Sequence, residues 1–279
     1  MASAQQPDEA DSPSPSVGGK AGSHKPPYRL GGMGYQDATG RRLSYGSYLK
    51  IPELLDLQHG LTDAHDELLF IVVHQVYELW FKVLLDELEA TRDAIQADEL
   101  RAARHYLARV KVIEALLVEQ VAVLETMAPQ DFLTFRSELA PASGFQSIQF
   151  REVEYLSGLK DRGYLKALDD EPGARRRLEA RLAEPSLADA FAALLGRRGL
   201  SVAQLYQDGT QHADVLDLAE ALLDHDEGFR IWRLRHVQMV ERQIGDKPGT
   251  GGSTGVRYLQ STLDKRFFPE LWQVRSQLD

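Results

Sequence analysis

The segment from Asp63 to Ala97 restricts the fold most, because its pattern predicts one long helix that is apolar around most of its circumference. Its middle reads LLFIVVHQVYELWFKVLL, and Asp63 is placed to cap its first turn. The polar positions form a single stripe, which consists of Gln75, Glu78, Lys82, Asp86 and Glu89. A helix with a single narrow polar stripe is typical of a protein interior. We therefore expect this helix to be central and buried.

The rest of the chain also favours helices, and it shows neither an alternating strand pattern of useful length nor an internal repeat. We therefore expect an all-α fold, with a single domain over residues 39–279. Residues 1–38 are rich in Ser, Pro, Gly, Ala and Asp, which predicts a disordered N-terminal tail. Residues 160–225 contain shorter helical patterns between breaks, and we interpret them as a small peripheral helical insert. Further helices are expected over 98–127, from about 131 to a break at 141–144, from about 146, and from about 256.

Cysteine and charge usage exclude several classes of function. The 279 residues contain no cysteine, which excludes disulfides, cysteine-bound zinc or iron–sulfur sites and thiolate-bound haem. The formal net charge of −10 argues against binding to nucleic acid. The longest strongly apolar run, Leu68 to Val73, is too short to span a bilayer, and no signal-peptide pattern opens the sequence. We expect a cytoplasmic protein with no membrane partner.

A histidine lies at the centre of the apolar face of a second amphipathic helix. At 100° per residue, Phe229, Trp232, His236 and Met239 fall on one arc. An imidazole that faces a core needs a partner for its second nitrogen. That partner is either a metal or haem iron, or a carbonyl group of the core, and the pattern alone leaves both readings open.

The second informative histidine is His74, in the long helix, with Phe70 one turn before it and Tyr77 one turn after it. The pattern places His74 at the edge of the apolar face, where a histidine needs no functional role. Two histidines that face the interior nevertheless suggest a metal or a haem. None of the eight histidines has a glutamate three residues before it, as a di-iron helical bundle would need. A haem held by one histidine, with the other on its distal side, remains open.

A loop and an arginine are candidates for binding an anion. The loop Pro248–Gly255 is rich in glycine and leads into a helix N-terminus, so it exposes backbone N–H groups, although a flexible connector would have the same composition. It is not a phosphate-binding P-loop, because no Gly-Lys-Ser/Thr follows. Arg136 lies among Phe132, Phe135 and Phe145 in the sequence, where it is either a surface residue or a bidentate clamp for a carboxylate.

Five ordered segments of the chain are similar to the tryptophan 2,3-dioxygenase family. They are YGSYLKIPELL (45–55), HDELLFIVVHQVYELWFK (65–82), FRSELAPASGFQSIQFRE (135–152), WRLRHVQMVERQIGDKPGTGGSTG (232–255) and YLQSTLDKRFFPELW (258–272). Residues 1–38 and 160–225 carry little of the resemblance.

The resemblance implies an all-α homotetramer with one non-covalent haem b per subunit, ferrous in its active form. It implies that the enzyme inserts O2 across the indole C2–C3 bond of L-tryptophan to give N-formylkynurenine, the first step of tryptophan degradation by the kynurenine pathway. Two rival functions share the haem pocket: a haem-based sensor, which needs no clamp for an amino acid, and an indoleamine dioxygenase of broader specificity. A non-catalytic helical scaffold is a further alternative, which a colourless protein would favour.

The resemblance also assigns roles at the haem. His236 matches the proximal ligand of the haem iron, and His74 matches the distal histidine beside the bound indole. Because the indole N–H is a poor acid, we expect His74 to orient the ring rather than to remove a proton. Phe70 matches an aromatic residue of the pocket wall, and Ser143 and Gly144 match a turn close to haem and indole.

The remaining roles concern the amino-acid part of the substrate. Arg136 matches the arginine that binds the carboxylate, and Thr250 matches a loop threonine that contacts the head group. At Phe132 some relatives carry tyrosine, so affinity here rests more on Arg136. A neighbouring subunit is expected to lend three residues to the site, namely Tyr45, Tyr48 and Leu49.

Overall fold

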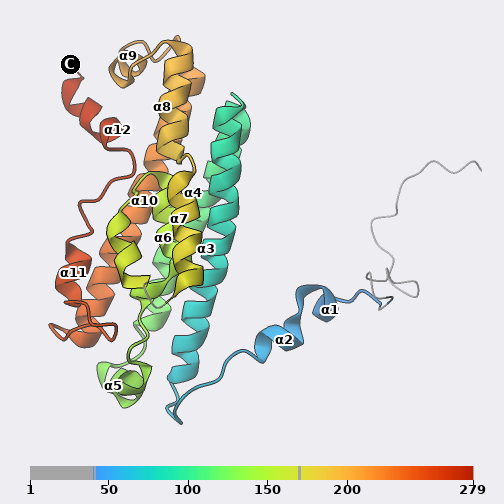
Figure 1. Cartoon of the computed structure of the whole chain (residues 1–279), viewed down its shortest axis with the longest axis vertical. Helices are drawn as coiled ribbons and strands as arrows, with labels where there is room; N and C mark the ends of the chain where they lie inside the picture. The colour runs from blue at the N-terminus through green and yellow to red at the C-terminus, as the bar shows by residue number, and fades with distance from the viewer. Residues whose placement is uncertain (1–39, 41, 169–170, 279) are drawn as a thin grey trace, which may run out of the picture. The chain divides into compact units, whose positions relative to one another are not determined.

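The computed structural model describes residues 40, 42–168 and 171–278, which form helices and connecting loops with no β-strand (Figure 1). The predicted all-α fold is therefore confirmed. The chain divides into two compact units, residues 1–57 and 58–279, which we describe separately. The expected tail, residues 1–38, lies outside the described residues, and the domain bounds predicted from the sequence stay a prediction.

The described part of the first unit consists of two short helices, α1 (Tyr45–Leu49) and α2 (Ile51–Leu55). The side chain of Ser44 accepts a hydrogen bond from the backbone N–H of Ser47, which caps α1. Lys50 has a left-handed backbone (φ 55°) and separates the two helices. Neither helix contains a buried residue, so these helices have no core of their own.

Three long helices form the frame of the second unit: α3 (Glu67–Gln96), α4 (Leu100–Leu124) and α10 (Ala213–Ile244). α4 packs against both α3 and α10 (Figure 1). Their apolar faces meet in the main core, which includes Leu84, Leu88, Leu107, Leu117 and Leu222. The expected long helix is therefore present as α3, but Leu68, Val72 and Leu79 are exposed on it, so the prediction that it is buried around most of its circumference is wrong for this chain taken alone.

Shorter elements complete the second unit. They are α5 (Pro129–Phe135), α6 (Ile148–Ser157), α7 (Pro172–Ala183), α8 (Leu187–Arg198), α9 (Val202–Gln207), α11 (Val256–Gln260) and α12 (Pro269–Gln273), with 3-10 turns at Arg136–Leu139, Gly144–Gln146, Arg162–Leu168 and Val274–Gln277. The predicted break at 141–144 falls between α5 and α6.

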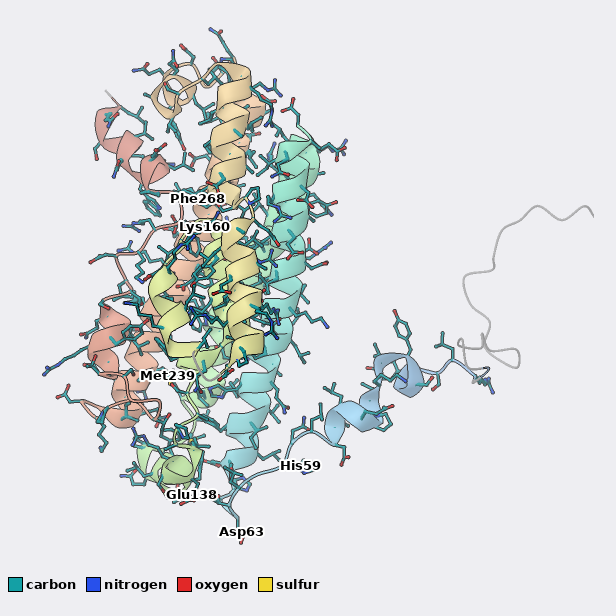
Figure 2. The ribbon with its side chains drawn as sticks, viewed as in Figure 1. His59, Asp63, Glu138, Lys160, Met239 and Phe268 are labelled. Carbon is teal, nitrogen blue, oxygen red and sulfur yellow. The ribbon has the colours of Figure 1, made fainter. Side chains whose placement is uncertain are left out.

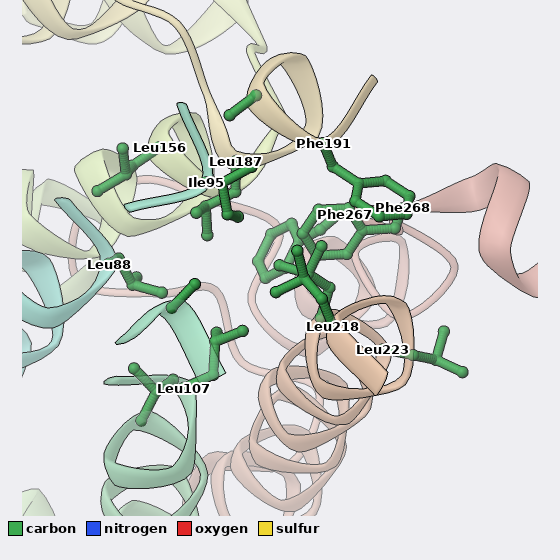
Figure 3. Close-up of a cluster of buried hydrophobic side chains, with 14 of the residues drawn as sticks. Leu88, Ile95, Leu107, Leu156, Leu187, Phe191, Leu218, Leu223, Phe267 and Phe268 are labelled. Atoms are coloured by element: carbon green, nitrogen blue, oxygen red, sulfur yellow. The ribbon is translucent and has the colours of Figure 1, made fainter. Parts of the chain in front are cut away.

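The segment 160–225 is more central than an insert at the periphery would be. Leu187, Phe191 and Leu194 of α8 are buried in the main core, where Figure 3 shows Phe191 beside Phe267 and Phe268. In addition, α10, the helix that carries Phe229 and His236, begins at Ala213, within the segment that was interpreted as an insert. Helical spacing shows which face of a helix is apolar but not which helices cover it, and this explains the difference.

α3 begins later than predicted, because Glu67 rather than Asp63 organises its first turn. Glu67 is buried, and its carboxylate accepts hydrogen bonds from the backbone N–H groups of Leu61 and Thr62 and from the Thr62 hydroxyl. These bonds, that of the Thr62 hydroxyl first, hold the pKa of Glu67 below its ordinary value. Figure 2 shows the loop from His59 to Asp63 running into the start of α3.

Among the described residues, α3 alone is long and apolar enough to cross a membrane, by length and composition. It nevertheless packs against α4, α6 and α8, and its Glu78 accepts hydrogen bonds from Ser147 and Gln149 of neighbouring segments. These contacts cover one side of α3, and 22% of its apolar window is buried within this chain.

The C-terminal segment is fixed to α10 by one buried carboxylate. Asp226 Oδ2 accepts hydrogen bonds from the backbone N–H groups of Phe267 and Phe268 and from the indole of Trp272. Three donors on one buried oxygen hold the chain after α11 against the main core.

Candidate active site

A cavity of about 290 Å³ lies among α3, α5, α6, α10, α11 and the loop before α11. Eight residues predicted for the site line it together: Phe70, His74, Phe132, Arg136, Ser143, Gly144, His236 and Thr250. Tyr45, Tyr48 and Leu49 belong to the first unit, where all three are exposed. The second unit thus brings together eight of the eleven predicted residues, although they lie up to 180 positions apart in the sequence (250 minus 70).

His74 has a fixed tautomer. Its Nδ1 lies 2.7 Å from the carbonyl oxygen of Phe70, one turn earlier on α3. A carbonyl oxygen can only accept, so Nδ1 carries the proton and donates the hydrogen bond. Burial lowers the pKa of His74 below its ordinary value, which keeps the ring neutral at physiological pH. Its Nε2 therefore has a free lone pair at the cavity wall.

His236 is the second histidine of the cavity, on the facing helix α10. Its ring stacks on Trp232, with the centroids 5.0 Å apart and the planes at 7°. Burial, and after it the charge of His74, lowers the pKa of His236 to about 4, so this ring is also neutral. Among the described residues, neither nitrogen of His236 has a hydrogen-bond partner.

His225, also on α10, shows what a core histidine looks like in this protein. It is almost fully buried, its Nδ1 lies 2.7 Å from Glu114, and its Nε2 lies 2.8 Å from the Ser157 hydroxyl. Both ring nitrogens are thus satisfied by the protein. The sequence left two readings open for His236, and the contrast with His225 favours the reading in which an external group completes its bonding.

Aromatic rings form the wall beside His74. The Phe70 ring lies 4.1 Å from the imidazole of His74, and Phe70, Phe132 and Phe135 form a mutual cluster with centroids 5.4 to 5.7 Å apart. Only Phe135 is fully buried, while Phe70 and Phe132 line the cavity. Such a wall suits a flat apolar ring.

Arg136 supplies a positive charge at the cavity. It follows α5 directly, and its Nη2 donates a hydrogen bond to the carbonyl oxygen of Pro248 in the loop before α11. Among the described residues, no carboxylate pairs with its guanidinium. The remaining N–H groups are available to a bound anion, for which the planar guanidinium is well suited.

The glycine-rich loop packs tightly against the break between α5 and α6. The hydroxyl of Thr250 donates to the carbonyl oxygen of Ala142, at 2.7 Å. A Cβ atom at Gly251 would lie 2.6 Å from the Cβ of Ser143, so only glycine permits this approach. Because the Thr250 hydrogen is already donated, its oxygen keeps lone pairs that can accept a bond from a ligand ammonium.

Ser143 and Gly144 form the turn on the other side of this contact. The Ser143 hydroxyl accepts a hydrogen bond from the backbone N–H of Phe145. The backbone N–H of Ser143 donates a hydrogen bond to the side chain of Gln146. A Cβ atom at Gly144 would meet no heavy atom within 4 Å, so a larger side chain would project into free space at the cavity.

Two buried arginines of the cavity wall were not predicted from the sequence. Arg151 of α6 and Arg233 of α10 both bond to the carboxylate of Glu154, at 2.6 and 2.7 Å. One carboxylate for two guanidinium groups leaves this wall with an excess positive charge. The i,i+3 spacing of Arg151 and Glu154 within an apolar segment could have predicted their ion pair. The contact of Glu154 with Arg233 depends on how α6 and α10 pack, so the sequence pattern does not show it.

These features define an all-helical protein whose cavity suits an aromatic ligand that carries a carboxylate. The sequence profile of the tryptophan 2,3-dioxygenase family matches residues 32–198 and 174–278. A tryptophan 2,3-dioxygenase of Nocardioides sp. is 53% identical over 256 residues, which cover 86% of this chain and 96% of that protein. Those of Herpetosiphon aurantiacus and Serratia proteamaculans are 46% and 41% identical, over 85% of this chain and 98% and 94% of their own lengths. The chain belongs to the tryptophan 2,3-dioxygenase family, as the five segments indicated.

Proposed function

We propose that this chain is a haem-dependent dioxygenase that inserts O2 across the indole C2–C3 bond of L-tryptophan to give N-formylkynurenine. The observation that carries the proposal is the facing pair of neutral histidines, His74 and His236, in one cavity with the unpaired guanidinium of Arg136. A haem-based sensor would not need Arg136 or the Thr250 loop, and a scaffold would need no cavity.

The residues present fit haem b better than a bare metal ion. The described part of the chain contains no group of three or more metal-binding side chains, and there is no cysteine. A haem brings four nitrogen ligands of its own and needs one from the protein. Neutral His236, whose two nitrogens have no hydrogen-bond partner in the part of the chain that the structure describes, would hold it as the proximal ligand. When bound, the haem supplies ferrous iron, which binds O2.

The chain's own residues orient the substrate. The Nδ1–H of His74 donates a hydrogen bond to the carbonyl oxygen of Phe70, so Nε2 accepts a hydrogen bond from the indole N–H and sets the direction of the ring. The lowered pKa makes His74 a weak base, which supports orientation over proton removal. Phe70 provides the aromatic wall for the indole.

The amino-acid part of the substrate is bound at the other end of the cavity. Arg136 forms a charge-assisted pair with the carboxylate, and the Thr250 oxygen accepts from the ammonium. Without a phenolic hydroxyl at Phe132, Arg136 carries most of the carboxylate recognition. An indoleamine dioxygenase of broad specificity would not depend on these contacts.

The working form is a homotetramer in which a neighbour's α1 and α2 cover the cavity. Two features support association. The side chains of Tyr45 and Tyr48 are 77% and 70% exposed. Apolar side chains also stay exposed along α3 and α4, namely Leu68, Val72, Leu79, Val83, Val112, Leu116 and Val123. The acidic net charge agrees with an enzyme that does not bind nucleic acid, and we propose that the enzyme is cytoplasmic and has no membrane partner.

The proposal is tested by an absorption spectrum of the purified protein, followed by addition of oxygen to an anaerobic mixture with L-tryptophan. We expect a Soret band and oxygen-dependent formation of N-formylkynurenine. A colourless protein that cannot be loaded with haem would favour the scaffold. Haem without turnover would favour the sensor.

A further inference from the structure

The imidazole of His236 lies against a second ring of its own helix. Trp232 precedes His236 by one turn of α10, and the two ring planes are nearly parallel, at 7°, with centroids 5.0 Å apart. Carbon atoms in contact lie about 3.5–4.0 Å apart, so a centroid distance of 5.0 Å describes an offset stack. Rotation of the imidazole about its bond to Cβ would break this contact.

Trp232 is itself held in place by aromatic rings from three elements. Its ring centroid lies 5.2 to 6.4 Å from the centroids of Tyr77, Phe81, Phe150 and Phe229. Tyr77 is fixed in turn by a hydrogen bond from its hydroxyl to the carbonyl oxygen of Leu117. The side chain of Trp232 is therefore a rigid support for His236, because residues of α3, α6 and α10 hold it in place.

Among the described residues, no hydrogen bond is present that would set the ring plane of His236. In many metal sites, the second nitrogen of a histidine ligand donates to a carboxylate or carbonyl group, and that bond fixes the ring. His225 is held in this way by Glu114 and Ser157. His236 has no such bond to any described residue, whereas the stack on Trp232 is close and parallel.

We propose that Trp232 is a positioning residue, which sets the plane of the His236 imidazole relative to the haem through ring stacking. This inference rests on the proposed role of His236 as the iron ligand. Stacking removes rotational freedom from the imidazole before the haem binds, so less of that freedom is lost on binding. It also selects one orientation of the ring relative to the four haem nitrogens.

The test compares ring-keeping and ring-free substitutions of Trp232. Trp232→Phe keeps a smaller ring, and Trp232→Leu and Trp232→Met keep apolar volume without one. Trp80→Phe is the matched control, because Trp80 lies on α3 and does not line the cavity. The readouts are the iron–histidine stretching band of the ferrous haem protein in resonance Raman spectra and the dissociation constant of haem. Circular dichroism and thermal unfolding of each variant show whether the fold is kept.

We expect the ring-free variants to broaden and shift the iron–histidine band and to weaken haem binding about 3- to 10-fold, the size of one aromatic pair. Trp232→Phe should broaden the band less, and Trp80→Phe should leave it as in the wild type. If Trp232→Leu does not fold, Trp232→Met and Trp232→Phe decide. If Trp232→Met or Trp232→Leu folds and its iron–histidine band is unchanged, the inference is overturned. If neither ring-free variant folds, an unchanged band in Trp232→Phe overturns it.

The same spectra separate this inference from the assignment on which it rests. If the wild type shows no iron–histidine band, or if His236→Ala keeps the band, then His236 is not the ligand and the proposed haem site is wrong. If His236→Ala loses the band while the ring-free Trp232 variants keep it unchanged, only the positioning role fails.

Discussion

Three residues of the cavity have hydrogen-bonding groups without a partner among the described residues, namely His74, Arg136 and Thr250. His74 keeps a free Nε2 because its Nδ1 is bonded to Phe70, and Arg136 keeps free N–H groups because it has no carboxylate partner among the described residues. The lone pairs of the Thr250 oxygen are free because its hydrogen goes to Ala142. A zwitterion with an aromatic ring offers the complement of each group.

Replacing Arg136 by alanine should raise the KM for L-tryptophan strongly while the haem stays bound. Loss of a charge-assisted pair costs about 2–4 kcal/mol, which corresponds to about 30- to 1000-fold. Steady-state kinetics measure the change, and Arg104→Ala is the control, since Arg104 pairs with Asp217 and does not line the cavity. Tryptamine lacks the carboxylate and should be affected little. An equal loss for both substrates would mean that the effect is structural.

Replacing His74 by alanine should slow turnover without abolishing it, because the indole loses its orienting bond but keeps its aromatic wall. Haem content should stay as in the wild type, since the proposed ligand of the iron, His236, is on α10. Turnover numbers and the Soret absorbance per protein check both points. Complete loss of turnover with normal haem and normal tryptophan binding would show instead that His74 is an obligatory base.

At the scale of elements, the sequence shows the long helices well and their neighbours poorly. α3 and α4 follow from periodicity, and so does the break between α5 and α6. The early start of α10 was missed because Gly228 interrupts the pattern, although its role is to make room: a Cβ atom there would lie 2.6 Å from the Glu114 carboxylate. The packing of the turn at Ser143 and Gly144 on the loop before α11 leaves no local pattern in the sequence.

For the site, the residues alone supplied candidates and the resemblance supplied roles. Spacing identified His74, His236 and Arg136 but could not show that they share a cavity, because that depends on how α3, α5 and α10 pack. The charge cluster of Arg151, Arg233 and Glu154 was missed for the same reason.

Gly251→Ala should impair tryptophan turnover, because the new Cβ would collide with Ser143 and push Thr250 away from the turn. Misplacement of a binding element by about 1 Å costs on the order of 100-fold in rate, so we expect a loss of about 10- to 100-fold in kcat/KM. Gly252→Ala is the control for loop strain, since it has a left-handed backbone but meets no atom within 4 Å. Similar losses for both variants would contradict the steric account.

The first turn of α3 should depend on pH through Glu67. Hydrogen bonds lower the pKa of Glu67 in the folded protein, so its contribution to stability is full above the ordinary value near 4.5 and is lost as the pH falls through the lower folded value. Glu67→Gln should therefore lower Tm at neutral pH and flatten its fall in acid. Thermal unfolding at several pH values measures this. Asp63→Asn should change neither, because Asp63 is exposed, and an identical pH profile for the wild type and Glu67→Gln would refute the assignment.

At the scale of the whole molecule, the account requires that subunits complete one another's sites. A double Tyr45→Ala, Tyr48→Ala variant and a His236→Ala variant should each be inactive alone. Mixed tetramers should regain activity, because some sites then combine an intact haem pocket with an intact neighbouring α1. Activity after subunit exchange, verified by native mass, measures this. No recovery in exchanged mixtures would mean that each chain builds its own site.

The central claim is the insertion of both atoms of one O2 molecule into L-tryptophan. The most direct measurement is mass spectrometry of the product formed by the reduced, haem-loaded protein from L-tryptophan under ¹⁸O2. The account predicts N-formylkynurenine with two labelled oxygen atoms, and none from His236→Ala. Absence of this product, or a product that carries only one labelled atom when formed, would contradict it.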